Sequence, residues 1–344
     1  MINQQNKNQI RKLWDDLDGA GPEDIYEICV DHFARDCQWN GPAPFNLQCG
    51  PKAIAQTFWS PLKHAIADLK REPHMFIGGN SFGRAGGGMD EAMWVCGTGY
   101  LKRNANDDFI GIPATEYPLK LRWGEFYCLR DGEIFASQII LDFVDWFELI
   151  GLFVLPKSRG VAHVYPATTG FDGLLHDKQD ACETDKTIQF GRQFICGGLN
   201  RYDTTDLSSM GMAGFFHKNL KWYGPVGIGA CLSLDQFEKL HQRPWLAAFR
   251  DRKVQDLDAL IAEGSLFGAV GTAGVKATHS GPYLDTKVTD TQILVSGLDF
   301  WLRDGDKLTE NWVFVDMVDL FHQIGKDLFT RMRVQAKNLK SSDK

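Results

Sequence analysis

The spacing of hydrophobic residues predicts helices at the start of the chain and strands after them. Apolar residues recur every three or four positions in residues 5–19 and 22–36, and a further helix is predicted at residues 51–72. From Trp94 onward the pattern changes to short apolar stretches separated by turn residues, which is typical of antiparallel strands. Helices followed by a run of strands predict an α+β fold rather than alternating βαβ units.

The sequence at the end of this first half is repeated at the end of the second half. Residues 130–151 and residues 303–325 both begin with Arg-Asp-Gly, and Asp142 in the first stretch has Asp316 as its counterpart in the second. Asp-Gly followed by β-branched and aromatic residues indicates a hairpin. Each stretch therefore carries an aspartate within an otherwise apolar predicted strand.

The repeat extends over most of the chain. Residues 33–46 match residues 216–229 at an offset of 183 residues, and from Gly97-Thr98, which match Gly271-Thr272, the offset is 174. The change of offset reflects a glycine-rich stretch, residues 78–88, that the second copy lacks and that we interpret as a flexible turn. A repeat of this length predicts a duplicated domain rather than a solenoid unit.

The predicted organisation is two tandem domains. The first covers residues 1–155, a linker rich in Pro, Gly and Thr covers residues 156–185, and the second domain covers residues 186–344. Two copies in one chain are expected to pack as an intramolecular pseudo-dimer, and a further homodimer is possible.

Composition narrows the function classes. The chain has 344 residues and a formal net charge of −7, which argues against nucleic acid or an anionic membrane as the main partner. The eight cysteines show no C-x-x-C pairing, so neither a zinc site nor a disulfide framework is indicated. The N-terminus lacks the apolar segment of a signal peptide and no apolar run is long enough to span a bilayer, so a cytoplasmic protein without a metal or cofactor is expected.

The duplicated aspartates are the first candidates for chemistry. Strand alternation places Glu310, Trp312, Phe314 and Asp316 on one face. An ionised carboxylate costs several kcal/mol to bury, so apolar neighbours are expected to raise the pKa of Asp316 and to suit it to acid/base work. The alternative is an aspartate that satisfies backbone groups at a strand end.

Several motifs resemble the SnoaL-like polyketide cyclase family, which has the nuclear-transport-factor-two-like fold. They are W-x-G-P, a Pro-containing helix that ends near Asp-Arg, T-H-x-G-x-x-L and D-G-x4-E-x-W-x3-D-x6-Q-x-G. In the second half they fall on Trp222-Gly224-Pro225, His241, Pro244, Asp251-Arg252, Thr278-His279, Gly281, Glu310, Trp312, Asp316, Gln323 and Gly325. The resemblance implies two cone-shaped domains, each with helices packed on a strongly curved antiparallel sheet around a pocket.

The resemblance also implies roles for particular residues. Cyclases of this family use an aspartate acid/base and a nearby histidine, without a cofactor, which by position are Asp316 and His279, and His241 could orient a substrate carbonyl. The first half departs from the pattern, since Ala105 stands where His279 stands, and Ala136 or Ser137 replaces Glu310. The second half is therefore the expected active half, and the first is a binding or structural partner.

The substrate is expected to be small and apolar or aromatic. The candidate binding residues are Trp39, Trp59, Asp142, Trp222, Arg252, Glu310, Trp312 and Phe314, although tryptophans also fill cores and Arg252 could simply form an ion pair at a helix end. The favoured function is a cofactor-free cyclase or isomerase that acts on a polyketide-like or other apolar carbonyl compound. The alternatives are a hydrolase or dehydratase with the same acid/base, and a non-catalytic small-molecule binding protein.

Overall fold

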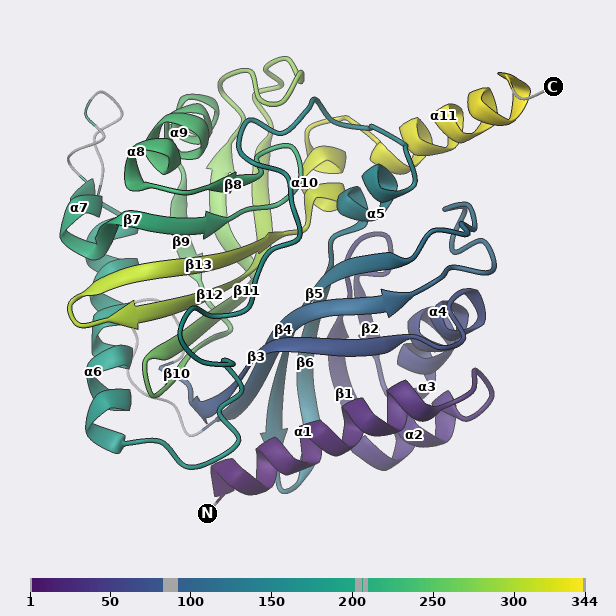
Figure 1. Cartoon of the computed structure of the whole chain (residues 1–344), viewed down its shortest axis with the longest axis horizontal. Coiled ribbons are helices and arrows are strands. Elements are labelled where there is room, and N and C mark those ends of the chain that lie inside the picture. The colour runs from purple at the N-terminus through teal and green to yellow at the C-terminus, as the bar shows by residue number, and fades with distance from the viewer. Residues whose placement is uncertain (1, 83–91, 202–205, 207–209, 343–344) are drawn as a thin grey trace.

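The computed structural model describes residues 2–82, 92–201, 206 and 210–342, and these residues form two units that each combine one sheet with helices (Figure 1). The first unit begins with helices α1 (Ile2–Gly19) and α2 (Ile25–His32). The predicted apolar stripe of α1 is buried. Helix α2 is shorter than predicted because strand β1 begins at Phe33.

Within the described residues, the first sheet has six strands in the order β2-β1-β6-β5-β4-β3. The strands are β1 (Phe33–Asn40), β2 (Leu47–Cys49), β3 (Lys70–Asn80), β4 (Met93–Arg103), β5 (Leu119–Arg130) and β6 (Glu133–Leu141). The predicted helix at residues 51–72 ends earlier and is made of α3 (Pro51–Ile54), the π-helix η1 (Ala55–Trp59) and α4 (Ser60–Ala65). Helix α5 (Phe143–Leu149) follows β6.

The second unit repeats this order. Its strands are β7 (Phe216–Tyr223), β8 (Ala230–Cys231), β9 (Lys253–Asp256), β10 (Ala259–Glu263), β11 (Leu266–Thr278), β12 (Gln292–Asp304) and β13 (Lys307–Val315). Its helices are α6 (Ala181–Arg192), η2 (Gln193–Leu199), α7 (Met212–Phe215), α8 (Leu234–Gln236), η4 (Phe237–Gln242), α9 (Arg243–Ala248), α10 (Met317–Gln323) and α11 (Leu328–Ser342).

Strand register shows that the two sheets are copies of one arrangement. In each unit the first strand runs parallel to the last, with Trp39 beside Ser137 and Trp222 beside Asn311, and the other pairings are antiparallel. The predicted α+β class with two tandem domains is confirmed.

The Arg-Asp-Gly sequence occupies different positions in the two hairpin turns. Asp131 and Gly132 are the central residues of the first turn, whereas Gly305 and Asp306 are central in the second. The turns have the same length, and the Arg-Asp-Gly sequence is displaced by one position between them, so the strands on both sides of the turn match at an offset of 174. Ala136, which pairs with Cys128 as Glu310 pairs with Leu302, is therefore the counterpart of Glu310.

A bulge changes one of the sequence matches. Gly97 pairs with Glu125 in the first sheet, and Ala269 pairs with Asp299 at the matched place in the second. Gly97 therefore corresponds to Ala269 rather than to Gly271, because β11 takes up two additional residues at an irregularity between Gly271 and Val275.

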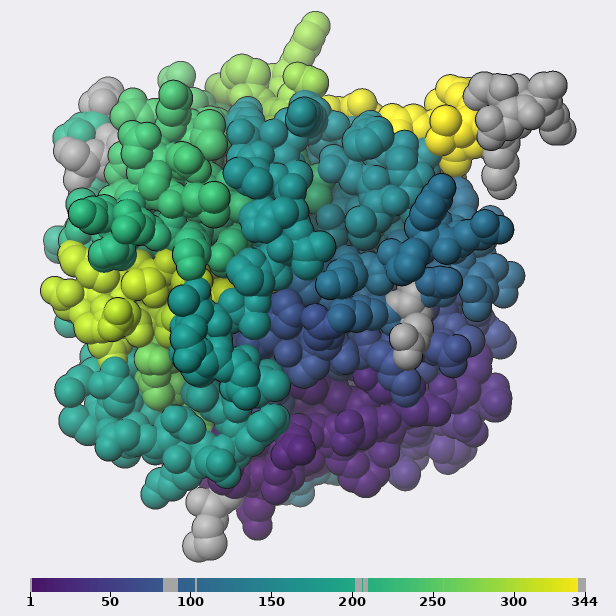
Figure 2. All heavy atoms as spheres, in the orientation of Figure 1, coloured from purple at the N-terminus to yellow at the C-terminus, as the bar shows by residue number. Residues whose placement is uncertain are grey.

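Two other predicted segments differ in detail. Gly78 and Gly79 belong to strand β3 rather than to a turn, and residues 83–88 of the predicted glycine-rich turn lie outside the described residues. Residues 156–180 contain no helix or named strand, and α6 begins at Ala181, inside the predicted linker. The linker follows the seam between the two units (Figures 1 and 2), where Leu174 forms a bridge with Phe76 and Val161 forms one with Ala230.

The two sheets pack against each other through their outer faces. One buried apolar cluster contains residues of both sheets. At its centre Phe126 and Phe300, which are matched positions 174 residues apart, lie with ring centroids at 5.3 Å. A contact between matched positions is the signature of an isologous interface, here within one chain. Each sheet is consequently buried on both faces.

Asp142 and Asp316 lie at this interface as helix caps and not inside strands. Asp142 accepts a hydrogen bond from Asp145 N at 3.1 Å and Asp316 accepts one from Asp319 N at 3.0 Å, so they cap α5 and α10. Each also interacts with the other unit. The N–H of Ala43 donates to Asp316 Oδ2 at 2.7 Å, and a backbone hydrogen bond from Val226, the counterpart of Ala43, acts on Asp142.

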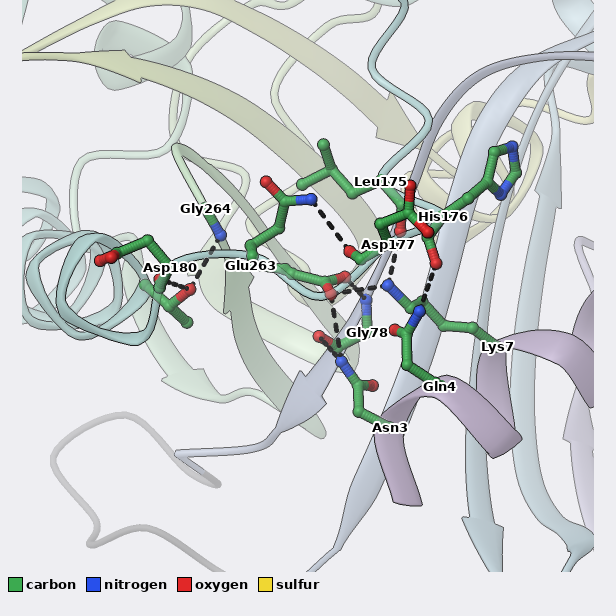
Figure 3. A network of polar contacts seen from close by, with 12 residues as sticks. Asn3, Gln4, Lys7, Gly78, Leu175, His176, Asp177, Asp180, Glu263 and Gly264 are labelled. Carbon is green, nitrogen blue, oxygen red and sulfur yellow. Dashed lines mark hydrogen bonds and ion pairs between the residues drawn. The ribbon is translucent and has the colours of Figure 1, made fainter. Parts of the chain in front are cut away.

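A buried polar network also joins the units (Figure 3). Nζ of Lys7 in α1 lies 2.6 Å from Oε1 of Glu263 at the end of β10, and both side chains are almost fully buried. Glu263 also accepts hydrogen bonds from Gly78 N at 2.9 Å and from Asn3 Nδ2 at 3.2 Å. A charge pair buried this completely needs such additional hydrogen bonds to offset its desolvation, and the two units supply them together.

Candidate functional site

The second unit contains a partly open cavity of about 190 Å³ between the inner face of its sheet and its helices. Residues of η2, η4 and α9 form one side, and residues of β11, β12 and β13 form the other. Most lining side chains are aliphatic or aromatic. The polar exceptions are Asp299, Asn311, His241, Gln242 and Arg252, and a few convergent polar groups in an apolar cavity are typical of a small-molecule site.

Asp299 presents a carboxyl group to this cavity. Gly297, Asp299 and Trp301 alternate along β12 and all three line the cavity, as the two-residue period of a strand requires. Burial raises the pKa of Asp299 to about 7, although a hydrogen bond from Asn311 acts in the opposite direction. That bond, from Nδ2 to Oδ1, is 3.4 Å long, so it offsets little of the desolvation. Asp299 can therefore exchange a proton near neutral pH.

His241 forms part of an aromatic wall. Its ring stacks on Trp222 with centroids at 4.3 Å and planes at 19°, and it is nearly parallel to Trp245 at 6.4 Å. Burial, followed by the positive charges of Arg252 and Arg159, lowers the pKa of His241 to about 3. The imidazole is therefore neutral at physiological pH. Among the described residues its Nδ1 has no hydrogen-bond partner, so it can interact with a bound molecule.

Arg252 supplies a permanent positive charge to the same cavity. The residue is buried, lines the cavity and donates a hydrogen bond to the carbonyl oxygen of Leu199. Within the described part of the chain, Oε1 of Gln242 and Nε1 of Trp301 are buried without a partner. Buried polar atoms in proteins are nearly always paired, so these two atoms mark positions where a ligand can form hydrogen bonds.

The matched region of the first unit is filled. Trp123 occupies the position of Gly297, and its ring meets Trp14 of α1 edge-on at 5.1 Å. Glu125 occupies the position of Asp299 and lies 3.3 Å from the buried guanidinium of Arg71, which also pairs with Asp18. The carboxylate of the first unit is thus held in an ion pair under three tryptophan rings, whereas that of the second faces open space.

The predicted alternation of β13 is correct, but the predicted face is the outer one. Glu310 and Trp312 point away from the cavity. Thr169 of the linker donates to Glu310 from its N at 2.7 Å, and Trp312 Nε1 donates to Pro166 O at 3.0 Å. The ring of Phe314 packs under the guanidinium of Arg122 on this face, although Phe314 also borders the cavity. The inward positions are Asn311, Val313 and Val315.

Of the three predicted catalytic residues, His241 lines the cavity and Asp316 and His279 do not. Burial raises the pKa of Asp316 to about 7, as its apolar surroundings predicted, but its carboxyl oxygens receive backbone N–H groups. His279 is fully buried, its Nδ1 hydrogen-bonds Oγ1 of Thr289 at 3.0 Å, and its ring packs against Phe249. Burial lowers the pKa of His279.

The predicted binding residues divide between the two units. Trp222 and Arg252 line the cavity. Trp39 packs against Phe58, at 4.9 Å between ring centroids, in the core of the first unit, and Trp59 lies beside the Arg71 guanidinium. The carboxylate of Asp142 receives Arg122 NH1 at 3.1 Å. These three residues of the first unit thus have partners within the core or the interface.

Asp299, Asn311 and Gln242 line the cavity but are not among the residues predicted from the sequence. The offset of 174 aligns Asp299 with Glu125, so a duplicated carboxylate was visible in this strand as well as in the next. The shared Asp142/Asp316 pair drew attention because it is identical in type, whereas the pair in β5 and β12 is one Glu and one Asp.

Removing the Asp316 carboxylate is expected to lower stability without affecting the cavity. Asp316→Ala removes the cap of α10 and leaves Ala43 N–H without its acceptor. We therefore expect the free energy of unfolding to fall by about 1–3 kcal/mol. Asp316→Asn should lower the free energy of unfolding by less, because asparagine also caps helices. Urea unfolding measures both, and an alanine variant as stable as the parent would contradict this structural role.

Two further features bear on the class of protein. Among the described residues, no group of three or more His, Cys, Asp or Glu side chains is placed to hold a metal ion. None of the helices in the described ranges is both long and apolar enough to cross a membrane.

Comparison with known proteins gives similarities of fold. No family model and no curated protein sequence matches the chain. Solved structures similar to it include IdmH from Streptomyces antibioticus, provisionally assigned as a polyketide cyclase (15% identity, 43% of this chain and 99% of IdmH, TM-score 0.35). Others are a provisionally assigned SnoaL-like polyketide cyclase from Jannaschia sp. (16%, 42% and 89%, TM-score 0.31) and AclR from Streptomyces galilaeus, provisionally assigned as a hydroxylase (20%, 42% and 98%, TM-score 0.35). At these identities the likeness concerns the fold alone.

Proposed function

We propose that the cavity of the second unit is an acid/base catalytic site in which Asp299 removes a proton from a carbon next to a carbonyl group. The observation that carries this proposal is the position of the Asp299 carboxyl, which faces an apolar cavity. Among the described residues its one side-chain hydrogen bond is the long contact with Asn311. Groups with a shifted pKa in a cavity are more often functional than those on open surface.

The chemistry follows from the two ionisation states of Asp299. As a carboxylate it accepts the proton when the C–H bond breaks, and the electron pair of that bond moves to the carbonyl oxygen to form an enolate. As a carboxylic acid it returns the proton to carbon, which isomerises the compound. Alternatively, the enolate carbon forms a bond to the carbon of a second carbonyl, which closes a ring, and the alkoxide formed from that carbonyl takes the proton from Asp299. A pKa of about 7 suits both directions.

The other polar groups of the cavity have supporting roles in this proposal. Arg252 adds positive charge to the same cavity, which favours an intermediate that carries negative charge. His241 is neutral, so it donates or accepts a hydrogen bond without competing for the proton. The family resemblance implied Asp316 as the base, but its oxygens accept backbone N–H groups outside the cavity, and we therefore assign the role to Asp299.

Hydrogen–deuterium exchange tests the proposal without knowledge of the natural substrate. In D2O, the protein is expected to accelerate exchange at the carbon next to the ketone of phenylacetone or 3-benzoylpropionate, followed by proton NMR. Because the base must be ionised, kcat/KM for exchange should rise as the pH rises through about 7 and then level off. Binding of these probes without accelerated exchange would instead support the non-catalytic binding protein.

A further inference from the structure

The size of the cavity limits what the second unit can accept. The cavity measures about 190 Å³, whereas binding sites for drug-sized ligands usually measure about 300–1,000 Å³. An apolar cavity of about 150 Å³ holds one benzene molecule. The present cavity therefore has room for one six-membered ring and a few additional atoms, and fused polycyclic compounds exceed it.

The cavity wall also has a definite shape. The rings of Trp222, His241 and Trp245 are nearly parallel to one another, with interplanar angles of 19° and 22° between successive rings. Trp222 and His241 cover part of each other's faces, so the stack offers a ligand ring edges and the remaining faces, and aromatic rings pack against both in edge-to-face or offset arrangements.

Two arginines lie in or beside this cavity, together with the Asp299 carboxyl, although the whole chain carries a formal charge of −7. Arg252 lines the cavity. Arg159 of the linker lies outside it with its guanidinium 5.9 Å from the Tyr283 ring, and Tyr283 lines the cavity. Both arginines act on His241. The two charges favour a negatively charged ligand, and an arginine inside an apolar cavity strengthens that preference because water does not screen it.

We propose that the second-unit cavity binds a compound with a single ring and one carboxylate group, with the ring on the Trp222–His241–Trp245 wall and the carboxylate directed to Arg252. The inference deepens the proposed function by naming the class of substrate. It departs from the polyketide-like substrate that the sequence resemblance implied.

Isothermal titration calorimetry with probes of increasing ring number, and one neutral probe, separates the effect of ligand size from the effect of ligand charge. Benzoate, 1-naphthoate and 9-anthroate carry one carboxylate on one, two and three rings, and benzamide is the neutral counterpart of benzoate. At about pH 6, where Asp299 is mostly protonated, benzoate is expected to bind at least about tenfold more tightly than the other three, which corresponds to ~1.4 kcal/mol. None of these probes has an enolisable carbon, so binding is measured independently of catalysis.

Variants of the lining residues, one of them copied from the first unit, test the position of the ring and the role of Arg252. Gly297→Trp copies Trp123 and is expected to abolish benzoate binding, whereas Trp245→Ala enlarges the cavity and is expected to admit 1-naphthoate. Val295→Phe, at another lining position, serves as a second filling variant should Gly297→Trp melt below the parent. Arg252→Gln is expected to remove the difference between benzoate and benzamide.

Each alternative result has a separate meaning. If 9-anthroate binds as tightly as benzoate or more tightly, the limit to one ring is wrong. If benzamide binds as tightly as benzoate, the ligand does not need a carboxylate. No benzoate binding at millimolar concentration overturns the inference as a whole, even if deuterium exchange succeeds. Benzoate binding without any exchange activity leaves the ligand class standing and overturns the catalytic function.

Discussion

Asp299→Asn is expected to lower the rate of enzyme-catalysed deuterium exchange by about 10²–10⁴-fold, which is the usual contribution of a general acid/base. Asparagine has nearly the shape of aspartate and keeps a hydrogen-bonding group next to Asn311, but it cannot take up or release the proton. The comparison is made at about pH 8, where the parent Asp299 is mostly ionised because its pKa is about 7.

Asp299→Asn is expected to keep or raise the stability of the protein although it lowers the activity. A carboxyl whose pKa is raised by burial becomes less favourable in the folded state as the pH rises from the unfolded value toward about 7. Asp299→Asn removes that cost, so its melting temperature at pH 8 should equal or exceed that of the parent. Loss of activity together with gain of stability is a common trade at catalytic sites.

Asp316→Asn is the matched control. Burial also raises the pKa of Asp316 to about 7, so the two aspartates differ mainly in what they face: backbone N–H groups for Asp316 and the cavity for Asp299. Exchange activity should survive in Asp316→Asn. If exchange instead fails in Asp316→Asn and survives in Asp299→Asn, the family-based assignment of the base is correct and ours is wrong.

The fold was largely predictable from the sequence because duplication presents the same pattern twice. Two copies of a helix–strand order, with Trp39 and Trp222 at matched places, were enough to predict two α+β units. Details that depend on a displacement of one or two residues were less accessible. The shift within the Arg-Asp-Gly turns and the bulge between Gly271 and Val275 leave the local composition almost unchanged.

The candidate site was harder to predict for a physical reason. A strand that faces a core on one side and solvent on the other shows which face is inside. Here both faces of β13 are buried, since the first unit and the linker cover the outer one, so alternation could group Glu310, Trp312 and Phe314 without showing which way they point. The repeated aspartates are conspicuous because both copies need the same helix cap and the same contact across the interface. Such repetition reflects the shared fold as readily as shared chemistry.

The filled site of the first unit leads to the second large effect, on stability. Arg71 is buried with Asp18 and Glu125 as ionic partners and lies between 5.1 and 5.7 Å from the ring centroids of Trp14, Trp59 and Trp123. Burial raises the pKa of Glu125, and Arg71 acts against that rise. The guanidinium thus favours the ionised form of a buried carboxyl that desolvation drives toward its neutral form.

Arg71→Met is expected to lower the free energy of unfolding by about 3–5 kcal/mol, because removal of one member of a buried ion pair leaves an uncompensated charge. Methionine fills much of the volume between the tryptophans, so the loss reports the charge more than a cavity. Without Arg71 the pKa of Glu125 rises further above its unfolded value, and the cost should therefore be smaller at about pH 5 than at pH 8. Urea unfolding at the two pH values measures both effects.

A double-mutant cycle with Glu125→Gln isolates the pair. If the cost of Arg71→Met comes from the stranded Glu125 carboxylate, the double variant Arg71→Met/Glu125→Gln should be more stable than Arg71→Met alone, and its pH dependence should weaken. Exchange activity of the folded variants should stay at the parental level, because Asp299 belongs to the other unit. A loss for Arg71→Met below about 1 kcal/mol, or a double variant no more stable than Arg71→Met, would show that the tryptophan packing and not the ion pair maintains the filled site of the first unit.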